Sequence, residues 1–79
     1  GEQQIEHRNL GELCLSRGYK ERSENHFKAS LDISLRNNNK KEIAIDYRNF
    51  GNLNFNNGNR ADAEKFYRDA LNLALEVAT

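Results

Sequence analysis

The sequence predicts an all-α protein of four helices, arranged as two antiparallel helical hairpins that stack side by side. Three observations predict this class. The chain matches itself at an offset of 40 residues, its apolar residues recur three or four positions apart, and its 79 residues include no proline. An internal period of this size is typical of stacked supersecondary units, and apolar residues at this spacing are typical of helices rather than strands.

The internal repeat covers the whole chain. At an offset of 40, ten of 39 aligned pairs are identical, and other pairs conserve shape, as Phe27 and Tyr67 do. We therefore predict one domain, 1–79, in which repeat one spans 1–40 and repeat two spans 41–79. The identical pairs are Glu2/Glu42, Ile5/Ile45, Arg8/Arg48, Asn9/Asn49, Gly11/Gly51, Leu13/Leu53, Gly18/Gly58, Glu24/Glu64, Leu31/Leu71 and Leu35/Leu75.

Repeat one is predicted to contain helices at about 3–17 and 20–36, with ends uncertain by two to four residues. Leu10 and Leu13 belong to the apolar stripe of the first helix, three residues apart. Gly18 is suited to close that helix, because glycine adopts left-handed backbone without a Cβ penalty.

Repeat two is predicted to contain helices at about 40–57 and 60–77. A run of three asparagines ending at Asn39 joins it to repeat one, and asparagine tolerates left-handed backbone in turns. Asn39 and Glu42 have the spacing of a capping box, with asparagine in place of serine or threonine. Gly58 stands where repeat one has its helix-closing glycine.

Composition excludes several classes of function. Twelve Lys and Arg balance twelve Asp and Glu, so no net field attracts nucleic acid or anionic lipid. The longest apolar runs have three residues, too few for a membrane span or a signal peptide. The single cysteine, Cys14, cannot form an internal disulfide, and we expect a cytoplasmic protein. The start at Gly1 rather than at methionine favours a segment of a longer protein.

Small and aromatic residues follow a fixed order in each unit that resembles the tetratricopeptide repeat. In repeat one these positions are Gly11, Gly18, Ser23, Phe27, Ser30 and Leu31, and in repeat two they are Gly51, Gly58, Ala63, Tyr67, Ala70 and Leu71. The 40-residue period is similar to that of the longer-helix variants in kinesin light chains and spindle-orientation scaffolds. The resemblance implies a fragment of a right-handed α-solenoid.

These positions also have a mechanical role that is independent of the family. Gly11 and Gly51 should let the second helix of each hairpin approach the first closely. Phe27 and Tyr67 should fill the gap between successive hairpins, because aromatic side chains bury large areas.

The resemblance also implies a concave groove that the first helix of each hairpin lines. Its residues would be Ile5, Arg8, Asn9, Glu12, Leu15, Ser16, Ile45, Arg48, Asn49, Asn52, Phe55 and Asn56. Asn49 and Asn52 could bond a peptide backbone, and Arg8 and Arg48 could pair with an acidic group of the ligand. The alternative is that Arg8 pairs with Glu12 one turn away and that the asparagines bond across the helix pair.

The expected function is that of a non-enzymatic adaptor or scaffold that binds a peptide or helix of another protein. His7 and Cys14 lie about 10.5 Å apart along one helix, too far for a nucleophile and its base. We expect these residues and His26 to be packing residues, and we expect no cofactor, metal or nucleic acid. The rival reading, an enzyme or a nucleic-acid binder, would need a catalytic cluster or a basic face.

An alternative function is self-assembly through the two ends of the stack. Two repeats leave both ends uncovered, while about three are normally needed for stability. On the last helix the uncovered apolar residues would be Leu73, Leu75, Val77 and Ala78. This alternative predicts a homo-oligomer.

Overall fold

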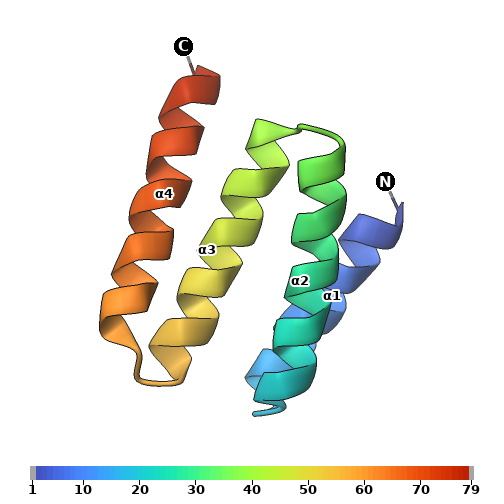
Figure 1. Ribbon diagram of the computed structural model, residues 1–79. Coiled ribbons are helices and arrows are strands. Elements are labelled where there is room, and N and C mark those ends of the chain that lie inside the picture. The colour runs from blue at the N-terminus through green and yellow to red at the C-terminus, as the bar shows by residue number, and fades with distance from the viewer. Residues whose placement is uncertain (1, 79) are drawn as a thin grey trace.

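Four helices account for most of the computed structural model, which describes residues 2–78. They are α1 (Glu2–Ser16), α2 (Lys20–Arg36), α3 (Lys40–Asn56) and α4 (Arg60–Ala78) (Figure 1). Residues 2–78 contain no strand, so the all-α class is confirmed. Each predicted helix end lies within one residue of the observed end.

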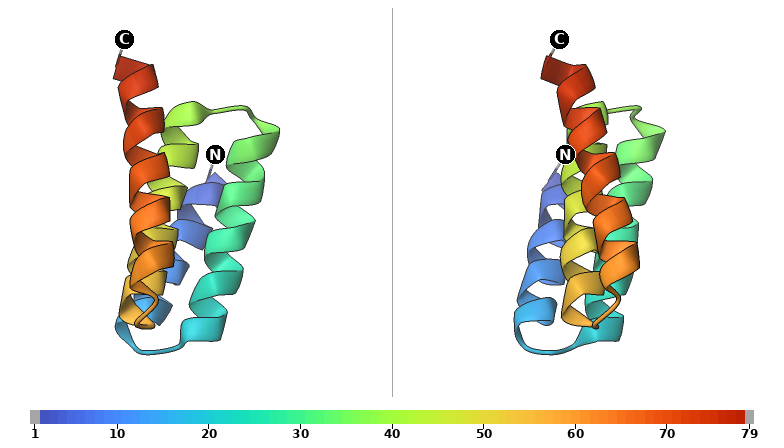
Figure 2. Two further views of the ribbon diagram at one scale, coloured as in Figure 1. Left: turned by 60° about the vertical axis from the view of Figure 1, so that its left-hand side comes forward. Right: turned by 90° about the vertical axis from the view of Figure 1, so that its left-hand side faces the viewer.

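The helices form two hairpins that stack. α1 packs against α2, α3 packs against α4, and the hairpins meet chiefly where α2 packs against α3. The right-hand view of Figure 2 places α1 and α3 towards one side of the stack and α2 and α4 towards the other. The first helices of the two hairpins therefore share one layer, with little direct contact between α1 and α3.

The three connections place one residue each in left-handed backbone. Gly18 has φ +82°, Gly58 has φ +83°, and Asn38 has φ +51° at the corresponding point of the middle connection. Asn39 then begins α3, and its side-chain oxygen accepts a hydrogen bond of 3.2 Å from the backbone N–H of Glu42. The predicted asparagine turn and cap are both confirmed.

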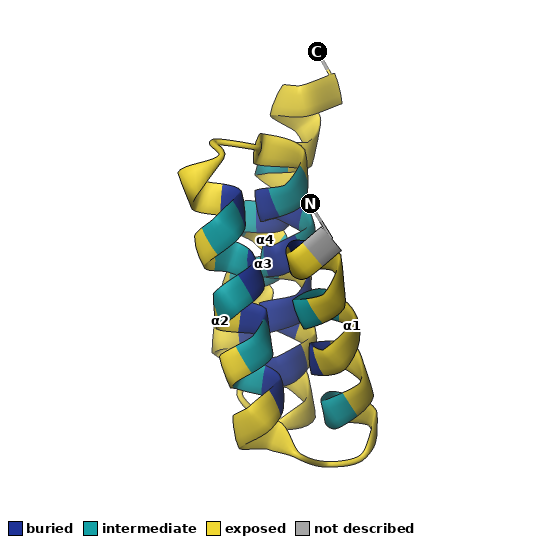
Figure 3. Ribbon diagram, turned by 90° about the vertical axis from the view of Figure 1, so that its right-hand side faces the viewer, coloured by how far each residue is buried: buried dark blue, intermediate teal, exposed yellow. Residues whose placement is uncertain are grey.

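The apolar core lies where the hairpins meet. Phe27 of α2 is 1% exposed and makes an edge-on ring contact of 6.1 Å with Phe50 of α3. Phe50 in turn stacks on Phe66 of α4 at 5.5 Å between ring centroids. Figure 3 shows the buried positions along the facing sides of α2 and α3, while the C-terminal turns of α4 are exposed.

A glycine on the first helix of each hairpin leaves room for an aromatic ring of the second helix. A Cβ atom at Gly11 would lie 2.5 Å from Cε1 of Phe27, and one at Gly51 would lie 2.5 Å from Cε1 of Tyr67. Both distances are far below van der Waals contact, so the expected close approach within each hairpin is confirmed.

A buried polar network also joins the hairpins, and the sequence did not lead us to expect it. Asp46 of α3 is 0% exposed, and its Oδ1 accepts a hydrogen bond of 2.7 Å from the hydroxyl of Ser30. The hydroxyl of Ser34 donates to Oδ2, and Gln4 of α1 donates to that same hydroxyl. Arg8 Nη2 lies 3.4 Å from Asp46 Oδ1. The buried carboxylate therefore has partners from α1 and α2, as a buried charge requires.

Candidate functional site

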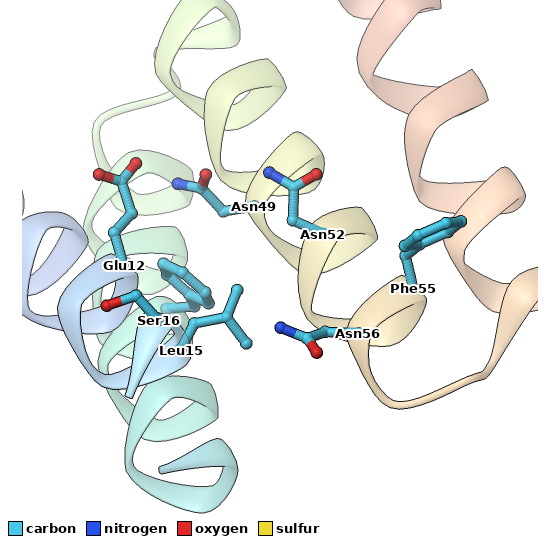
Figure 4. A pocket seen from close by; sticks show the side chains of 8 residues that line it. Glu12, Leu15, Ser16, Asn49, Asn52, Phe55 and Asn56 are labelled. Carbon is cyan, nitrogen blue, oxygen red and sulfur yellow. The ribbon is translucent and has the colours of Figure 1, made fainter. Parts of the chain in front are cut away.

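A groove runs between α1 and α3 on the layer that the first helices form, and we call it the α1–α3 groove. It has a volume of about 680 Å³. Its lining residues are Glu12, Leu15 and Ser16 of α1, Phe27 of α2, and Asn49, Asn52, Phe55 and Asn56 of α3 (Figure 4). Seven of these eight residues belong to the groove predicted from the sequence.

Helical spacing explains why these side chains converge. Asn49, Asn52 and Asn56 are three and then four residues apart, so they form one row along α3. Glu12 and Ser16 are four residues apart on α1, so they also share one side of their helix. The two rows face each other because α1 and α3 lie in one layer.

Asn49 carries an unused hydrogen-bond donor. The residue is 2% exposed, and its Nδ2 finds no hydrogen-bond partner among residues 2–78. Figure 4 shows this nitrogen turned towards Glu12 across the groove. Buried polar groups almost always have a partner, and an unsatisfied one costs about 1–3 kcal/mol. The nitrogen has less than 1 Å² of accessible surface, so an acceptor in the groove would recover that loss once the Asn49 side chain turned outwards.

A hydrogen bond to the neighbouring helix orients Asn52. Tyr67 of α4 donates its hydroxyl to Asn52 Oδ1 at 2.6 Å. This bond leaves the amide nitrogen of Asn52 as a donor, and Figure 4 shows that nitrogen on the side of Asn49. The alternative of asparagines bonding across the helix pair is confirmed for Asn52, while Asn49 has no such bond within the described chain.

The groove combines one negative charge with apolar surface. Among the described residues that line it, only Glu12 is charged. Leu15 is half-buried and points towards Asn56, and Phe55 is exposed at the α4 edge of the groove, so apolar surface borders the amide row on two sides (Figure 4). The ring of Phe27 forms part of the lining and belongs to the core. Phe27 was not predicted in the groove, because packing was the only role expected of it.

The remaining predicted groove residues lie elsewhere. Ile5 and Asn9 are exposed on α1, outside the α1–α3 groove. Arg8 is half-buried and its Nη2 lies 2.6 Å from Glu42 Oε2, as well as near Asp46. Its partners are thus on α3, rather than the Glu12 that the alternative reading proposed.

A second hollow lies between α3 and α4, nearer the N-terminal end of α3 than the groove, and we call it the α3–α4 face. It has a volume of about 600 Å³ and is mostly apolar. Its lining residues are Lys41, Ala44, Ile45, Arg48, Tyr67, Ala70, Leu71, Ala74, Val77 and Ala78. Ile45 and Arg48 were predicted in the groove but border this face, so the structure does not bring Arg8 and Arg48 together.

The two histidines form a pair within repeat one. His7 Nδ1 lies 3.2 Å from His26 Nδ1, and their ring centroids are 5.4 Å apart. Tyr47 and Phe66 make the corresponding ring contact in repeat two, at 6.0 Å. The packing role expected of His7 and His26 agrees with this contact. Residues 2–78 hold no group of three or more potential metal ligands.

Comparison with known proteins does not extend this description. No protein-family model, no curated protein and no solved structure matches the chain. None of the helices in residues 2–78 has the length and apolar character to cross a bilayer. Fold and site together define a small protein of stacked helical hairpins with an amide-lined groove.

Proposed function

We propose that this chain is a non-enzymatic protein-interaction module that binds a segment of a partner protein in the α1–α3 groove. The observation that carries the proposal is the buried amide nitrogen of Asn49, which has no hydrogen-bond partner among the described residues and borders the groove. A peptide carbonyl is the acceptor that such a donor fits.

The chemistry of the lining predicts the chemistry of the ligand. Asn49 and Asn52 present donors to backbone carbonyls, and Leu15 and Phe55 offer apolar contact to a side chain. Glu12 favours a basic side chain at the α1 edge of the groove. Arg8 is already paired with Glu42 and Asp46, so the ligand is basic and apolar rather than acidic.

The tetratricopeptide resemblance supports this proposal. Members of that family present the first helices of their hairpins to a ligand, and here α1 and α3 supply seven of the eight lining residues. The chain would then be two repeats of a right-handed solenoid with the longer 40-residue period. This interpretation requires a stack of helical hairpins, and the contacts between the four helices are those of such a stack.

Selection from a displayed random-peptide library tests the proposal. We expect the selected peptides to share a lysine or arginine next to an apolar residue. Asn49→Ala should weaken their binding about tenfold, which corresponds to the loss of one hydrogen bond. Asn72→Ala is the matched control, because this asparagine is exposed on α4 outside the groove.

Charge reversal at Glu12 gives a second test of the proposed binding site. Glu12→Lys should lower the affinity for basic peptides and select acidic ones instead, with helicity unchanged by circular dichroism. Peptides whose binding is unchanged by both Asn49→Ala and Glu12→Lys would place the binding site outside the groove and refute the proposal.

A further inference from the structure

The α3–α4 face is the repeat-two counterpart of a surface that is covered in repeat one. Counting back 40 residues from six of its ten lining residues gives positions on α1 and α2 at or beside the contact with α3. The corresponding pairs are Ala44/Gln4, Arg48/Arg8, Tyr67/Phe27, Ala70/Ser30, Leu71/Leu31 and Ala74/Ser34.

Helix α3 covers the repeat-one surface with three residues of one stripe. Asp46 reaches Arg8 and the two α2 serines, Phe50 packs on Phe27, and Leu53 completes the buried cluster. Their spacing is four and then three residues, so they lie on one side of α3. An acid followed by two large apolar residues is therefore the pattern that this kind of surface accepts.

The repeat-two surface has no such cover within residues 2–78. Leu71 is 59% exposed and Val77 is 48% exposed, and both border the hollow. Arg48 is exposed there, whereas its counterpart Arg8 is half-buried in ion pairs. The face is thus apolar with two exposed cations at its edge, Arg48 and Lys41.

The same chain carries the matching stripe on α1. Glu6, Leu10 and Leu13 stand 40 residues before Asp46, Phe50 and Leu53. Glu6 is exposed, Leu10 is 43% exposed and Leu13 is 46% exposed, so the stripe faces away from the hairpin. One end of the stack therefore presents the pattern that the other end lacks.

We propose that α1 of a second copy of this chain docks on the α3–α4 face, as α3 docks on the first hairpin. The Glu6 carboxylate of one copy pairs with the Arg48 guanidinium of the other, and Leu10 packs over Tyr67 and Leu71. The contact joins two different surfaces, so it is head-to-tail and each copy can bind two others. The two surfaces share no lining residue, although Tyr67 of the α3–α4 face also donates its hydroxyl to Asn52 of the α1–α3 groove.

The two repeats differ in the hydrogen-bond donors that they offer to a docked acidic side chain. Ser30 and Ser34 of repeat one are replaced by Ala70 and Ala74 in repeat two. A docked acid would lack the two hydroxyl donors that Asp46 has, and Arg48 would be its main partner. We therefore expect a more apolar contact, with association that depends on protein concentration.

Complementary charge reversals test the proposal. Sedimentation velocity and light scattering on the whole chain, from micromolar to millimolar concentration, should show species larger than a dimer at the upper end. Arg48→Glu alone and Glu6→Arg alone should each raise the dissociation constant at least about tenfold, because each places like charges at the contact. Mixing the two variants in equal amounts should restore assembly, since each contact between unlike variants again pairs opposite charges.

A control pair of charge reversals separates this contact from general charge attraction. Arg68→Glu and Glu64→Arg change the net charge by the same amounts, and both residues are exposed on α4 away from the hollow. Each of these variants should assemble like the wild type. A wild-type protein that stays monomeric over the whole range would overturn the proposal, and so would assembly that Arg48→Glu leaves unchanged. A helical content equal to wild type by circular dichroism shows that each variant folds.

Discussion

Gly11 and Gly51 occupy equivalent helix positions, but the structure predicts different results when each is changed to alanine. At both sites a new Cβ would lie 2.5 Å from an aromatic ring carbon. The ring beside Gly11 is Phe27, which is 1% exposed and fixed against Phe50. The ring beside Gly51 is Tyr67, which is half-buried and borders the open α3–α4 face.

The change in the free energy of unfolding on each substitution combines two opposing effects. Alanine in place of glycine inside a helix stabilises it by about 0.5–1 kcal/mol. Overpacking a fixed core costs about 1–3 kcal/mol. For Gly11→Ala the second effect is larger, and we expect a net loss of about 1–2 kcal/mol. For Gly51→Ala the tyrosine ring can move outwards at the cost of its exposed hydrogen bond to Asn52, the gain in helix propensity offsets this loss, and we expect a change of about zero.

Urea unfolding followed by far-UV circular dichroism measures both values. The midpoint should shift for Gly11→Ala while the slope m stays constant. The measurements belong at low protein concentration, so that association does not contribute to stability. Asn25→Gly and Asn25→Ala, at an exposed position of α2, calibrate helix propensity within the same protein. A Gly51→Ala loss equal to or greater than the Gly11→Ala loss would refute the reasoning, and so would a stabilising Gly11→Ala.

Three other features of the fold predict stability changes in the same assay. Asp46→Asn should cost about 2 kcal/mol, because the charged partner of Arg8 is lost from a buried network; a change near zero would contradict this. Replacing His7 by tyrosine and His26 by phenylalanine, the ring pair that repeat two carries, should stabilise by about 1 kcal/mol; a loss would show that the two sites differ in shape. Asn38→Ala should cost about 1 kcal/mol through its φ of +51°, whereas Asn38→Gly should cost nothing; equal effects would exclude backbone strain as the cause.

Most of the fold could be predicted from the sequence because its signals are local and occur twice. Helix ends followed from Gly18, Gly58 and the asparagine run, whose backbone and capping preferences act within a few residues. The close approach at Gly11 followed from a missing side chain. The Asp46 network was not predicted, although Asp46 lies between Ile43 and Phe50 on the buried stripe of α3, and Ser30 and Ser34 are one turn apart on α2.

The groove could be predicted only in part. The α3 row of Asn49, Asn52 and Asn56 was expected from the resemblance to the tetratricopeptide repeat, and helical spacing places the three residues on one side of α3. That spacing does not reveal which donors are already used within the fold. Tyr67 occupies the oxygen of Asn52, and the nitrogen of Asn49 remains without a partner in the described chain.

The sequence by itself determined four helices, their ends and their pairing into hairpins, because those properties depend on neighbouring residues and on a repeated pattern. Tertiary structure alone decided the different states of Arg8 and Arg48, which the repeat makes equivalent. Arg8 has a second hairpin beside it and is paired with Glu42 and Asp46, while Arg48 borders an open face. A repeated sequence gives each copy the same residues, but packing gives each copy different neighbours, and the neighbours determine which charges and donors remain available.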